Sequence, residues 1–392
     1  MDQSMIVAVI GAGTMGSGIA QVAAQAGHTT YLYDARSEAV DKALAGLAKT
    51  FEKLVEKGKV TKEEASLVLG RIKPATDLKQ LADCGLVIEA IIEDLGLKKK
   101  LFTVLEALLS PDATLATNTS SLSITAIAAA CRKPERVIGL HFFNPAPLLP
   151  LVEVVPGLET AQDLVQKASM LMRKWGKTPV TCKDTPGFIV NRVARPYYGE
   201  SIRIYEEGIA DMPTIDAAMK SVGFKMGPFE LMDLIGNDIN FAVTKSVFEA
   251  FFYDPRYKPS LTQQRQVESG RLGRKTGQGY YLYDANGGRI QDFQTSAGTL
   301  AEDPAALTER VLAMLINEAA DALFLNVASA ADIDLAMTKG VNYPKGLLAW
   351  ADEQGAAHWL AVLEHLQSDY GEDRYRPSPL LRRIAREKGA FF

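Results

Sequence analysis

The chain has 392 residues, of which 47% are hydrophobic and 23% charged, and its formal net charge at pH 7 is −4. This length allows two or three domains with cores of their own, and the weakly acidic balance argues against nucleic acid or an anionic membrane surface as the main partner. No apolar run approaches the roughly 20 residues that span a membrane. The three cysteines, Cys84, Cys131 and Cys182, are far apart, without the spacing of a metal site. We therefore expect a soluble, cytoplasmic protein with reduced thiols and no metal.

Residues 1–184 alternate short β-branched runs, such as IVAVI and GLVIEA, with helical stretches. This alternation predicts an α/β domain of the Rossmann type, in which a doubly wound, mostly parallel sheet carries helices on both faces. A long helical stretch at about 37–70 is interrupted near Gly58 and restarts at TKEE, a capping box. We expect a helical hairpin that projects from this domain.

The remainder of the chain is predominantly helical. It predicts two tandem all-helical C-terminal domains, at 185–284 and 305–392, joined by a polar, glycine-rich linker at 285–304.

The two helical domains resemble each other in sequence. Glu200 aligns with Glu318, and an IDxAM segment follows at the same distance after each glutamate. At the same offset Asn191 aligns with Glu309. An internal repeat that keeps the scaffold but changes this residue indicates one catalytic copy and one structural copy.

The stretch VAVIGAGTMGSG places Gly11, Gly13 and Gly16 in a G-x-G-x-x-G pattern between a strand and a helix. In a dinucleotide site the first glycine permits a tight turn, the second lets the backbone approach a pyrophosphate, and the third allows close helix–strand packing. Asp34 ends the next strand, where an acid binds ribose hydroxyls and repels a 2′-phosphate, so the pattern predicts NAD rather than NADP. The neighbouring Arg36 weakens that distinction, and a glycine turn that serves packing alone is the alternative.

Polar side chains also follow later strands of the predicted sheet. Glu93 and Lys98 follow one strand, Asn118 and Ser120 follow the next, and His141 ends a third. Because doubly wound sheets bind ligands at the carboxyl ends of their strands, these groups are expected near the nicotinamide. For Glu93 and Lys98 the alternative is a solvated, charged helix start.

His141 and Glu153 flank a proline-rich turn, so the second run can return antiparallel and bring the carboxylate toward the imidazole. A histidine can take an alcohol proton near neutral pH, and a carboxylate orients the ring and stabilises its protonated form. We predict a catalytic base and its orienting partner. The alternative is a core histidine bonded to the backbone.

These motifs together resemble the NAD-dependent L-3-hydroxyacyl-CoA dehydrogenase family. The segments that carry the resemblance, in order between residues 5 and 284, are GAGTMGSGIAQ, IEAIIED, NTSSLSIT, GLHFFNPAP, LVEVV, DTPGFIVNR, MGPFELMDLIG and GRKTGQGYY. The additional helical copy resembles the longer bacterial members. The segments NRVARPYY, GVNYPKGLLAW and RYRPSPLLR are similar to those members that act on 3-hydroxyadipyl-CoA in phenylacetate breakdown, and related members act on 3-hydroxybutyryl-CoA.

The resemblance implies an oxidoreductase of β-oxidation chemistry that uses NAD to convert an (S)-3-hydroxyacyl-CoA into the 3-oxoacyl-CoA. It implies His141 as base, Glu153 as its acidic partner, and Ser120 and Asn191 as substrate contacts. CoA contacts on the hairpin are implied at Thr50 and Lys57, and Thr50 departs from the serine of relatives. The cofactor residues expected from motif and resemblance are Gly11, Gly13, Thr14, Met15, Gly16, Asp34, Glu93, Lys98, Asn118, Asn144 and Lys275.

Arg195 lies one helical turn after Asn191, on the same helical face. Its guanidinium suits a distal carboxylate on the acyl tail, and an ion pair at the surface or between domains is the alternative. Single-copy family members use the helical domain as a dimer interface, so the second copy can replace a partner's domain; we expect a homo-oligomer, such as a dimer. Alternative functions are a non-catalytic NAD-binding protein and a subunit that works beside an enoyl-CoA hydratase.

Overall fold

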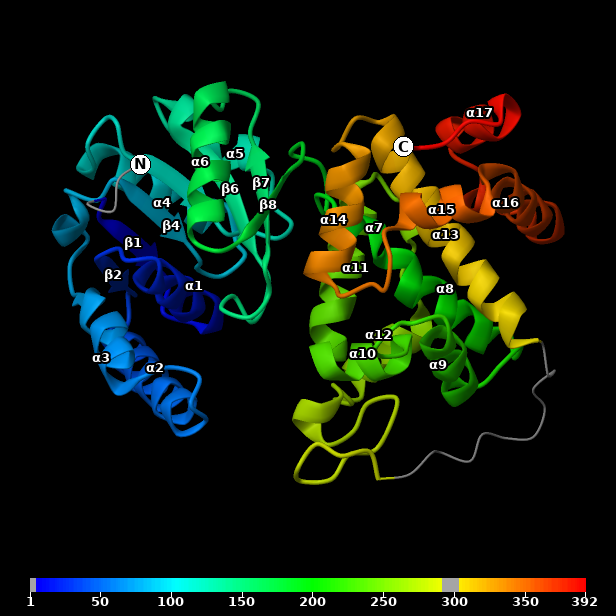
Figure 1. Cartoon of the computed structure of the whole chain (residues 1–392), viewed down its shortest axis with the longest axis horizontal. Helices are drawn as coiled ribbons and strands as arrows, with labels where there is room; N and C mark the ends of the chain where they lie inside the picture. The colour runs from blue at the N-terminus through cyan, green and yellow to red at the C-terminus, as the bar shows by residue number, and fades with distance from the viewer. Residues whose placement is uncertain (1–4, 291–302) are drawn as a thin grey trace. The chain divides into compact units, whose positions relative to one another are not determined.

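The computed structural model describes residues 5–290 and 303–392 and divides the chain into two compact units, Met1–Phe188 and Ile189–Phe392, here called the N-terminal unit and the helical unit (Figure 1). Residues 291–302, most of the expected linker, lie outside the described ranges. No helix of the described ranges is long and apolar enough to cross a membrane.

The N-terminal unit is built on one eight-stranded sheet with the strand order β3-β2-β1-β4-β5-β6-β7-β8. All neighbours pair in parallel except β6 and β7, which are antiparallel. This confirms the predicted doubly wound, mostly parallel sheet. The strands are β1 (Val7–Ile10), β2 (Thr30–Tyr33), β3 (Ile72–Ala75), β4 (Leu86–Glu89), β5 (Thr114–Thr117), β6 (Val137–Phe142), β7 (Leu151–Pro156) and β8 (Thr178–Thr181).

Both faces of the sheet are buried, which explains why the central strands read as continuous apolar runs rather than alternating ones. Successive residues of β1 belong to different cores: Val7 and Val9 to one, Ala8 and Ile10 to the other. The helices of this unit are α1 (Thr14–Gln25), α2 (Ser37–Glu56), α3 (Lys62–Arg71), η1 (Leu78–Leu81), α4 (Leu95–Leu108), α5 (Ile124–Ala128), η2 (Pro134–Arg136) and α6 (Gln162–Lys174).

Helices α2 and α3 form a hairpin that projects beyond the sheet (Figure 1). The capping box holds as the sequence indicates: Glu64 N–H donates to Thr61 Oγ1 (3.1 Å) and Thr61 N–H donates to Glu64 Oε2 (2.8 Å). These two bonds satisfy backbone donors at the start of α3, so the chain can reverse here and begin a second helix.

The helical unit contains both sequence repeats packed into one body. Its helices are α7 (Val190–Val193), α8 (Arg195–Glu206), α9 (Met212–Ser221), α10 (Pro228–Ile235), α11 (Asn237–Ala250), η3 (Pro255–Tyr257), α12 (Leu261–Glu268), η4 (Arg274–Thr276), α13 (Pro304–Phe324), α14 (Ala330–Gly340), α15 (Leu347–Gln354), α16 (Ala356–Tyr370), η5 (Asp373–Tyr375) and α17 (Pro379–Glu387).

Equivalent aspartates cap equivalent helices in the two repeats. Asp216 accepts from the backbone N–H of Phe229 (2.9 Å) at the start of α10, and Asp334 accepts from that of Leu348 (2.9 Å) at the start of α15. A carboxylate at a helix N-terminus satisfies free N–H donors and complements the helix dipole. The IDxAM segments are therefore alike because each supplies this cap.

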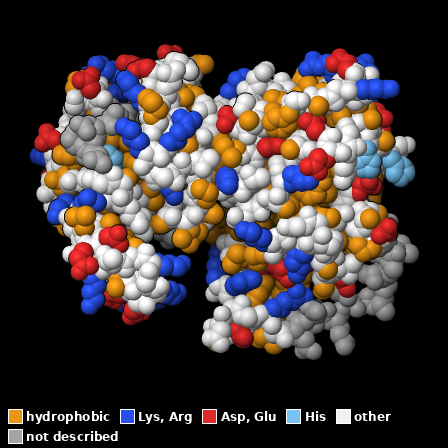
Figure 2. Space-filling model, in the orientation of Figure 1, with side chains coloured by type: hydrophobic (Ala, Val, Ile, Leu, Met, Phe, Trp, Pro, Cys, Tyr) orange, Lys and Arg blue, Asp and Glu red, His pale blue; other side chains and the backbone are white. Residues whose placement is uncertain are grey.

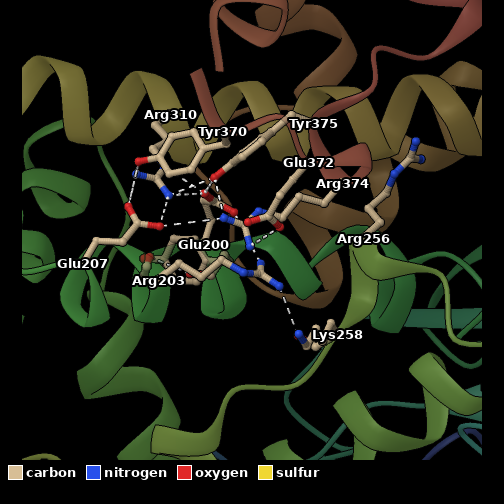
Figure 3. A network of polar contacts seen from close by, with 12 residues as sticks. Glu200, Arg203, Glu207, Arg256, Lys258, Arg310, Tyr370, Glu372, Arg374 and Tyr375 are labelled. Carbon is tan, nitrogen blue, oxygen red and sulfur yellow. Dashed lines mark hydrogen bonds and ion pairs between the residues drawn. The ribbon is translucent and has the colours of Figure 1, made fainter. Parts of the chain in front are cut away.

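The two repeats exchange equivalent ion pairs. Arg192 Nε donates to Glu318 Oε1 (2.5 Å), and Arg310 Nε donates to Glu200 Oε1 (2.7 Å). Tyr257 and Tyr375 each add a hydroxyl bond of 2.5 Å to the glutamate of the other repeat. Figure 3 shows the half of this arrangement around Glu200. The contacts are reciprocal, as in an isologous interface between two copies of one fold.

Candidate active site

The glycine loop between β1 and α1 has room for a ligand only at its second glycine. Gly11 has a φ of +105°, and a Cβ there would lie 2.4 Å from Ala90 O. A Cβ at Gly16 would lie 1.7 Å from Gly11 O, whereas one at Gly13 would meet nothing within 4 Å. Gly13 also gives α1 no side-chain cap. Space and unpaired N–H groups at the start of a helix are what a pyrophosphate needs.

Asp34 lies beside this loop. Its Oδ2 accepts from Ala12 N–H (2.9 Å) and its Oδ1 accepts from Arg36 N–H (3.0 Å). Burial raises the pKa of Asp34, but these backbone hydrogen bonds outweigh burial and hold that pKa below its ordinary value. The group is therefore an anion at neutral pH, suited to ribose hydroxyls and repulsive to a 2′-phosphate.

Lys98 is buried between two carboxylates. Its Nζ lies 2.5 Å from Glu89 Oε1 and 3.3 Å from Glu93 Oε2. Glu89 also accepts from Thr117 Oγ1 (2.7 Å) on the neighbouring strand. The ammonium therefore stabilises the carboxyl ends of β4 and β5. The sequence pattern alone does not predict this structural contact, because a charged residue after a strand is usually exposed.

Glu93 fixes the loop that carries Ser120. Its Oε1 accepts from Thr119 Oγ1 (2.5 Å) and from the N–H groups of Ser120 (3.0 Å) and Ser121 (3.2 Å). Burial raises the pKa of Glu93, but the Lys98 charge and these hydrogen bonds lower it below its ordinary value. Glu93 thus holds Ser120 in place at the carboxyl end of β5.

Asp184, near the end of the N-terminal unit, binds the start of α5 at the same edge of the sheet, and its sequence context did not single it out. It accepts from Ser123 Oγ (2.8 Å), Ile124 N–H (3.0 Å) and Thr125 N–H (2.7 Å) at the start of α5. A DTPG segment gives no local signal for a contact that lies about sixty residues away in the chain.

His141 and Glu153 face each other across β6 and β7. The strand register pairs them directly, and His141 Nδ1 lies 2.6 Å from Glu153 Oε2. Both residues are buried, and the imidazole also lies against Phe143, with ring centroids 4.4 Å apart. With Nδ1 bonded to the carboxylate, the ring is held in one orientation and Nε2 is the nitrogen left to exchange a proton with a substrate.

Asn118 joins this pair to the adjacent strand, because its Oδ1 accepts from Phe142 N–H (2.8 Å), one residue after the histidine. Asn144, which is exposed, begins the turn between β6 and β7. Lys177 anchors that turn by donating to the carbonyls of Ala146 and Leu149. The segment that follows His141 is therefore held in place by hydrogen bonds with Asn118 and Lys177.

The helical hairpin has exposed basic side chains on the solvent-facing side of α2. Thr50, whose hydroxyl donates to Gly46 O (2.9 Å), is exposed on α2, and Lys57 is exposed at the C-cap of this helix. Figure 2 shows Lys and Arg side chains interspersed with acidic ones over the hairpin. Helical spacing places further exposed lysines on the face of Lys57, opposite the buried residues of the helix; these are Lys42, Lys49 and Lys53.

Three predicted site residues belong to the helical unit. Asn191 lies in α7 and is half-buried. Lys275 Nζ contacts Asp238 Oδ1 (2.6 Å) in an exposed ion pair. Arg195 is buried, donates to Thr244 Oγ1 (3.2 Å) and lies over the Tyr198 ring. The predicted site residues of the N-terminal unit other than Thr50 and Lys57 gather at the carboxyl edge of its sheet.

A dinucleotide-type glycine loop beside an ionised aspartate, with a carboxylate-backed histidine on the same sheet, defines a nicotinamide-dependent dehydrogenase. Residues 6–185 match the family model of the 3-hydroxyacyl-CoA dehydrogenase NAD-binding domain, and residues 187–283 and 307–390 match that of the C-terminal domain. The chain belongs to the 3-hydroxyacyl-CoA dehydrogenase family and is an NAD-dependent oxidoreductase.

Individual relatives agree with this family. The chain is 44% identical to the 3-hydroxyadipyl-CoA dehydrogenase of Escherichia coli (strain K12), with 97% of each chain covered. It is 42% identical to the 3-hydroxybutyryl-CoA dehydrogenase of Clostridioides difficile, over 71% of this chain and 100% of that one. It is also similar to the crystal structure of a 3-hydroxybutyryl-CoA dehydrogenase from Escherichia coli K12, with a TM-score of 0.90, 43% identity and 98% of each chain covered.

Proposed function

We propose that the protein oxidises (S)-3-hydroxyadipyl-CoA to 3-oxoadipyl-CoA with NAD⁺, in the breakdown of phenylacetate in the cytoplasm. The support for this substrate is the 44% identity with a 3-hydroxyadipyl-CoA dehydrogenase over nearly the whole of both chains. The second candidate is 3-hydroxybutyryl-CoA, because a full-length structural relative with 43% identity is described as a dehydrogenase of that substrate.

The observation that carries the catalytic part of the proposal is the 2.6 Å contact between His141 Nδ1 and Glu153 Oε2. His141 Nε2 takes the proton of the 3-hydroxyl group, and Glu153 stabilises the imidazolium that results. Such acid–base assistance contributes roughly 10²- to 10⁴-fold in rate. When bound, NAD⁺ would supply the hydride acceptor for carbon 3, so the products would be the 3-oxoacyl-CoA, NADH and a proton.

The residues around the glycine loop fit NAD. The open side of Gly13 and the start of α1, with Thr14 and Met15, would hold the pyrophosphate, and Asp34 the adenosine ribose. Asn118, Asn144 and the segment braced by Glu93 and Lys98 would border the nicotinamide, with Lys275 contributed by the helical unit.

For the acyl-CoA we propose two groups of contacts. Ser120 and Asn191 hold oxygen atoms of the 3-hydroxyacyl group, and Thr50 and Lys57 on the hairpin contact the CoA moiety. The exposed lysines on the same face of α2 support this placement, because the phosphates of CoA are anionic. Arg195 is our candidate for a terminal carboxylate of the tail.

A substrate panel tests the proposal. The purified protein is assayed for NADH oxidation with 3-oxoacyl-CoA thioesters of several lengths, with and without a terminal carboxylate. We expect the highest kcat/KM with 3-oxoadipyl-CoA. A higher value with acetoacetyl-CoA would favour the butyryl assignment, and no turnover with any thioester, beside normal NADH binding, would refute the reaction.

We also propose that the second helical repeat takes the place of a partner's domain. The reciprocal contacts of Arg192 with Glu318 and of Arg310 with Glu200 support this, because each repeat supplies the same residues to the other. A homodimer would then form through a different surface, and light scattering after gel filtration measures whether it does.

A further inference from the structure

Phe188, the last residue of the N-terminal unit, has a backbone conformation that phenylalanine rarely adopts. Its φ is +49°, in the left-handed region that favours glycine and strains residues with a Cβ. The other described residues with a positive φ, glycines aside, are all exposed and follow the end of a helix by three residues or fewer; they are Phe252, Tyr253, Asn326, Asn342 and Lys388. A left-handed residue at such a place commonly ends a helix. Phe188 is instead 1% exposed and lies between β8 and α7, so helix termination does not explain its conformation.

The turn that ends at Phe188 does not require this conformation either. Phe188 N–H donates to Thr185 O (2.9 Å), with proline at the second place of the turn and Gly187, whose φ is +73°, at the third. This pattern is typical of a type II turn, in which only the third residue needs a positive φ. Asp184 fixes the start of the same segment by its three hydrogen bonds at the start of α5. A strained residue persists only where its surroundings hold it in this way, and such residues gather at active sites.

The side chain of Phe188 lies against the imidazole of His141. The two ring centroids are 5.9 Å apart and the ring planes form an angle of 59°, which is an ordinary geometry for packed aromatic rings. Phe143 is a second ring beside the imidazole, with its centroid at 4.4 Å and an angle of 51°. Both contacts lie within the N-terminal unit.

These aromatic contacts supply a constraint that the carboxylate does not. Glu153 holds the imidazole at Nδ1 through one hydrogen bond, and a ring held at one atom can still rock about that bond. Rings packed against the imidazole restrict this motion, because protein interiors are close-packed and a displaced ring would collide with its neighbours. The side chains of Phe143 and Phe188 have no polar atom, so neither competes with a substrate for Nε2.

We propose that Phe188 is a positioning residue for the dehydrogenase reaction, and that its strained backbone is retained because it places the ring against His141. This inference rests on the proposed role of His141 as the base. Phe188 does not touch the reacting atoms in this assignment; it acts by keeping Nε2 directed at the oxygen of the 3-hydroxyl group. Proton transfer depends on that direction, and a misplacement of about 1 Å can lower a rate by about 10²-fold.

The first experiment compares two buried phenylalanines of the N-terminal unit. Phe188→Leu keeps an apolar side chain and removes the ring. The rate constant for NADH oxidation by acetoacetyl-CoA is measured in a single turnover, which excludes product release, and is scaled to the NADH-binding sites found by fluorescence titration. We expect a fall of roughly 10- to 100-fold, with an unchanged half-saturating concentration of acetoacetyl-CoA. Phe102→Leu removes a ring from α4 that is also 1% exposed, and it should lower the thermal midpoint without changing the rate constant.

The second experiment asks whether the ring acts through the imidazole. Residues that act as one unit have non-additive effects, so Phe188→Leu should lower the rate constant no further when it is added to His141→Gln. An equal loss in both backgrounds would overturn the proposal. So would a normal rate in Phe188→Leu beside a slow His141→Gln. Normal turnover in His141→Gln would instead refute the role of the histidine, so the two failures are distinguishable.

A second substitution covers the case in which Phe188→Leu does not fold. Phe188→Met fills the same space with a flexible apolar chain and should show the same loss of rate. If neither variant binds NADH while Phe102→Leu does, Phe188 is needed for the fold of the whole unit. That result would overturn a role confined to His141.

Discussion

Glu153 stands directly opposite His141 on the neighbouring antiparallel strand, and 2.6 Å separates its Oε2 from the imidazole Nδ1. This pairing depends on the single antiparallel step in the sheet of the N-terminal unit, because a parallel strand would need a long crossover before its residues could meet. The short turn that contains Asn144 reverses the chain between β6 and β7. This reversal brings Glu153 opposite His141.

Replacement of His141 by Gln should remove the proton acceptor without preventing the binding of the dinucleotide. We expect kcat to fall by roughly 10²- to 10⁴-fold, the usual contribution of acid–base assistance, while NADH binding measured by fluorescence titration stays within a few-fold of wild type. Glu153→Gln should lower kcat in the same direction, because it removes the charge that stabilises the imidazolium. Unchanged turnover in His141→Gln would contradict the role of this histidine.

Replacement of Asp34 by Ser should weaken the binding of NAD and should shift the coenzyme preference toward NADP. Hydrogen bonds to a charged group contribute about 1.5–3 kcal/mol, so kcat/KM for NAD should fall by roughly 10- to 150-fold. The repulsion of a 2′-phosphate disappears with the carboxylate, so kcat/KM with NADP should rise. The ratio of kcat/KM with NADP to kcat/KM with NAD should therefore increase by more than the fall in kcat/KM with NAD alone. Lys167→Ala, at an exposed pair far along the chain, serves as the control; an unchanged ratio in Asp34→Ser would exclude the ribose contact.

Glu200→Gln should destabilise the helical unit strongly. Arg310 would keep its contact with Glu207 but lose its fully buried carboxylate partner, and breaking a buried pair costs about 3–5 kcal/mol, with Glu207 moderating the loss. The double variant Glu200→Gln/Arg310→Met should recover part of that loss, because the buried guanidinium is removed together with the carboxylate that it paired with. Urea denaturation of wild type, the two single variants and the double variant gives the coupling energy. Asp163→Asn, which removes an exposed pair, should leave the urea midpoint close to that of wild type.

Asp216 should make stability depend on pH. Burial raises the pKa of Asp216 to about 7, so the folded protein holds this proton more tightly than the unfolded chain does. The resulting contribution to the free energy of unfolding is complete below about pH 4 and is lost as pH rises through about 7. Wild type should therefore lose stability relative to Asp216→Asn between pH 5 and pH 8.

The comparison of wild type with Asp216→Asn cancels the other titrating groups, so only the difference between the two urea midpoints matters. A difference that stays constant from pH 5 to pH 8 would contradict the raised pKa. Asp163→Asn, at an exposed position, should show no such drift relative to wild type.

Much of the N-terminal unit follows from local sequence. The glycine pattern, the strand runs and the capping box at Thr61 each depend on residues within a few positions of one another, and the structure has them as the sequence indicates. The family and the NAD cofactor were also predictable from those motifs and are confirmed. The prediction that His141 lies close to Glu153 required only one assumption, namely that the proline-rich turn reverses the chain.

The contacts that sequence reasoning missed join distant parts of the chain. Asp184 caps α5 across about sixty residues, and Lys98 turns inward toward Glu89 rather than outward from a helix start. No periodicity encodes either choice, because burial of a lysine is decided by the carboxylates that tertiary packing brings to it. Likewise the repeat is visible in sequence, but the mutual ion pairs between its halves are not.

Duplication within one chain also changes how this body can evolve. In a symmetric pair of identical subunits every substitution occurs twice, once on each side of the axis, so a residue needed on one side is imposed on the other. Joined in one polypeptide, the two halves mutate separately. Asn191 could be kept while its counterpart became Glu309, and the arginine at 195 could arise opposite an alanine at 313. Assembly of the two halves is likewise insensitive to dilution, since covalent linkage fixes their effective concentration.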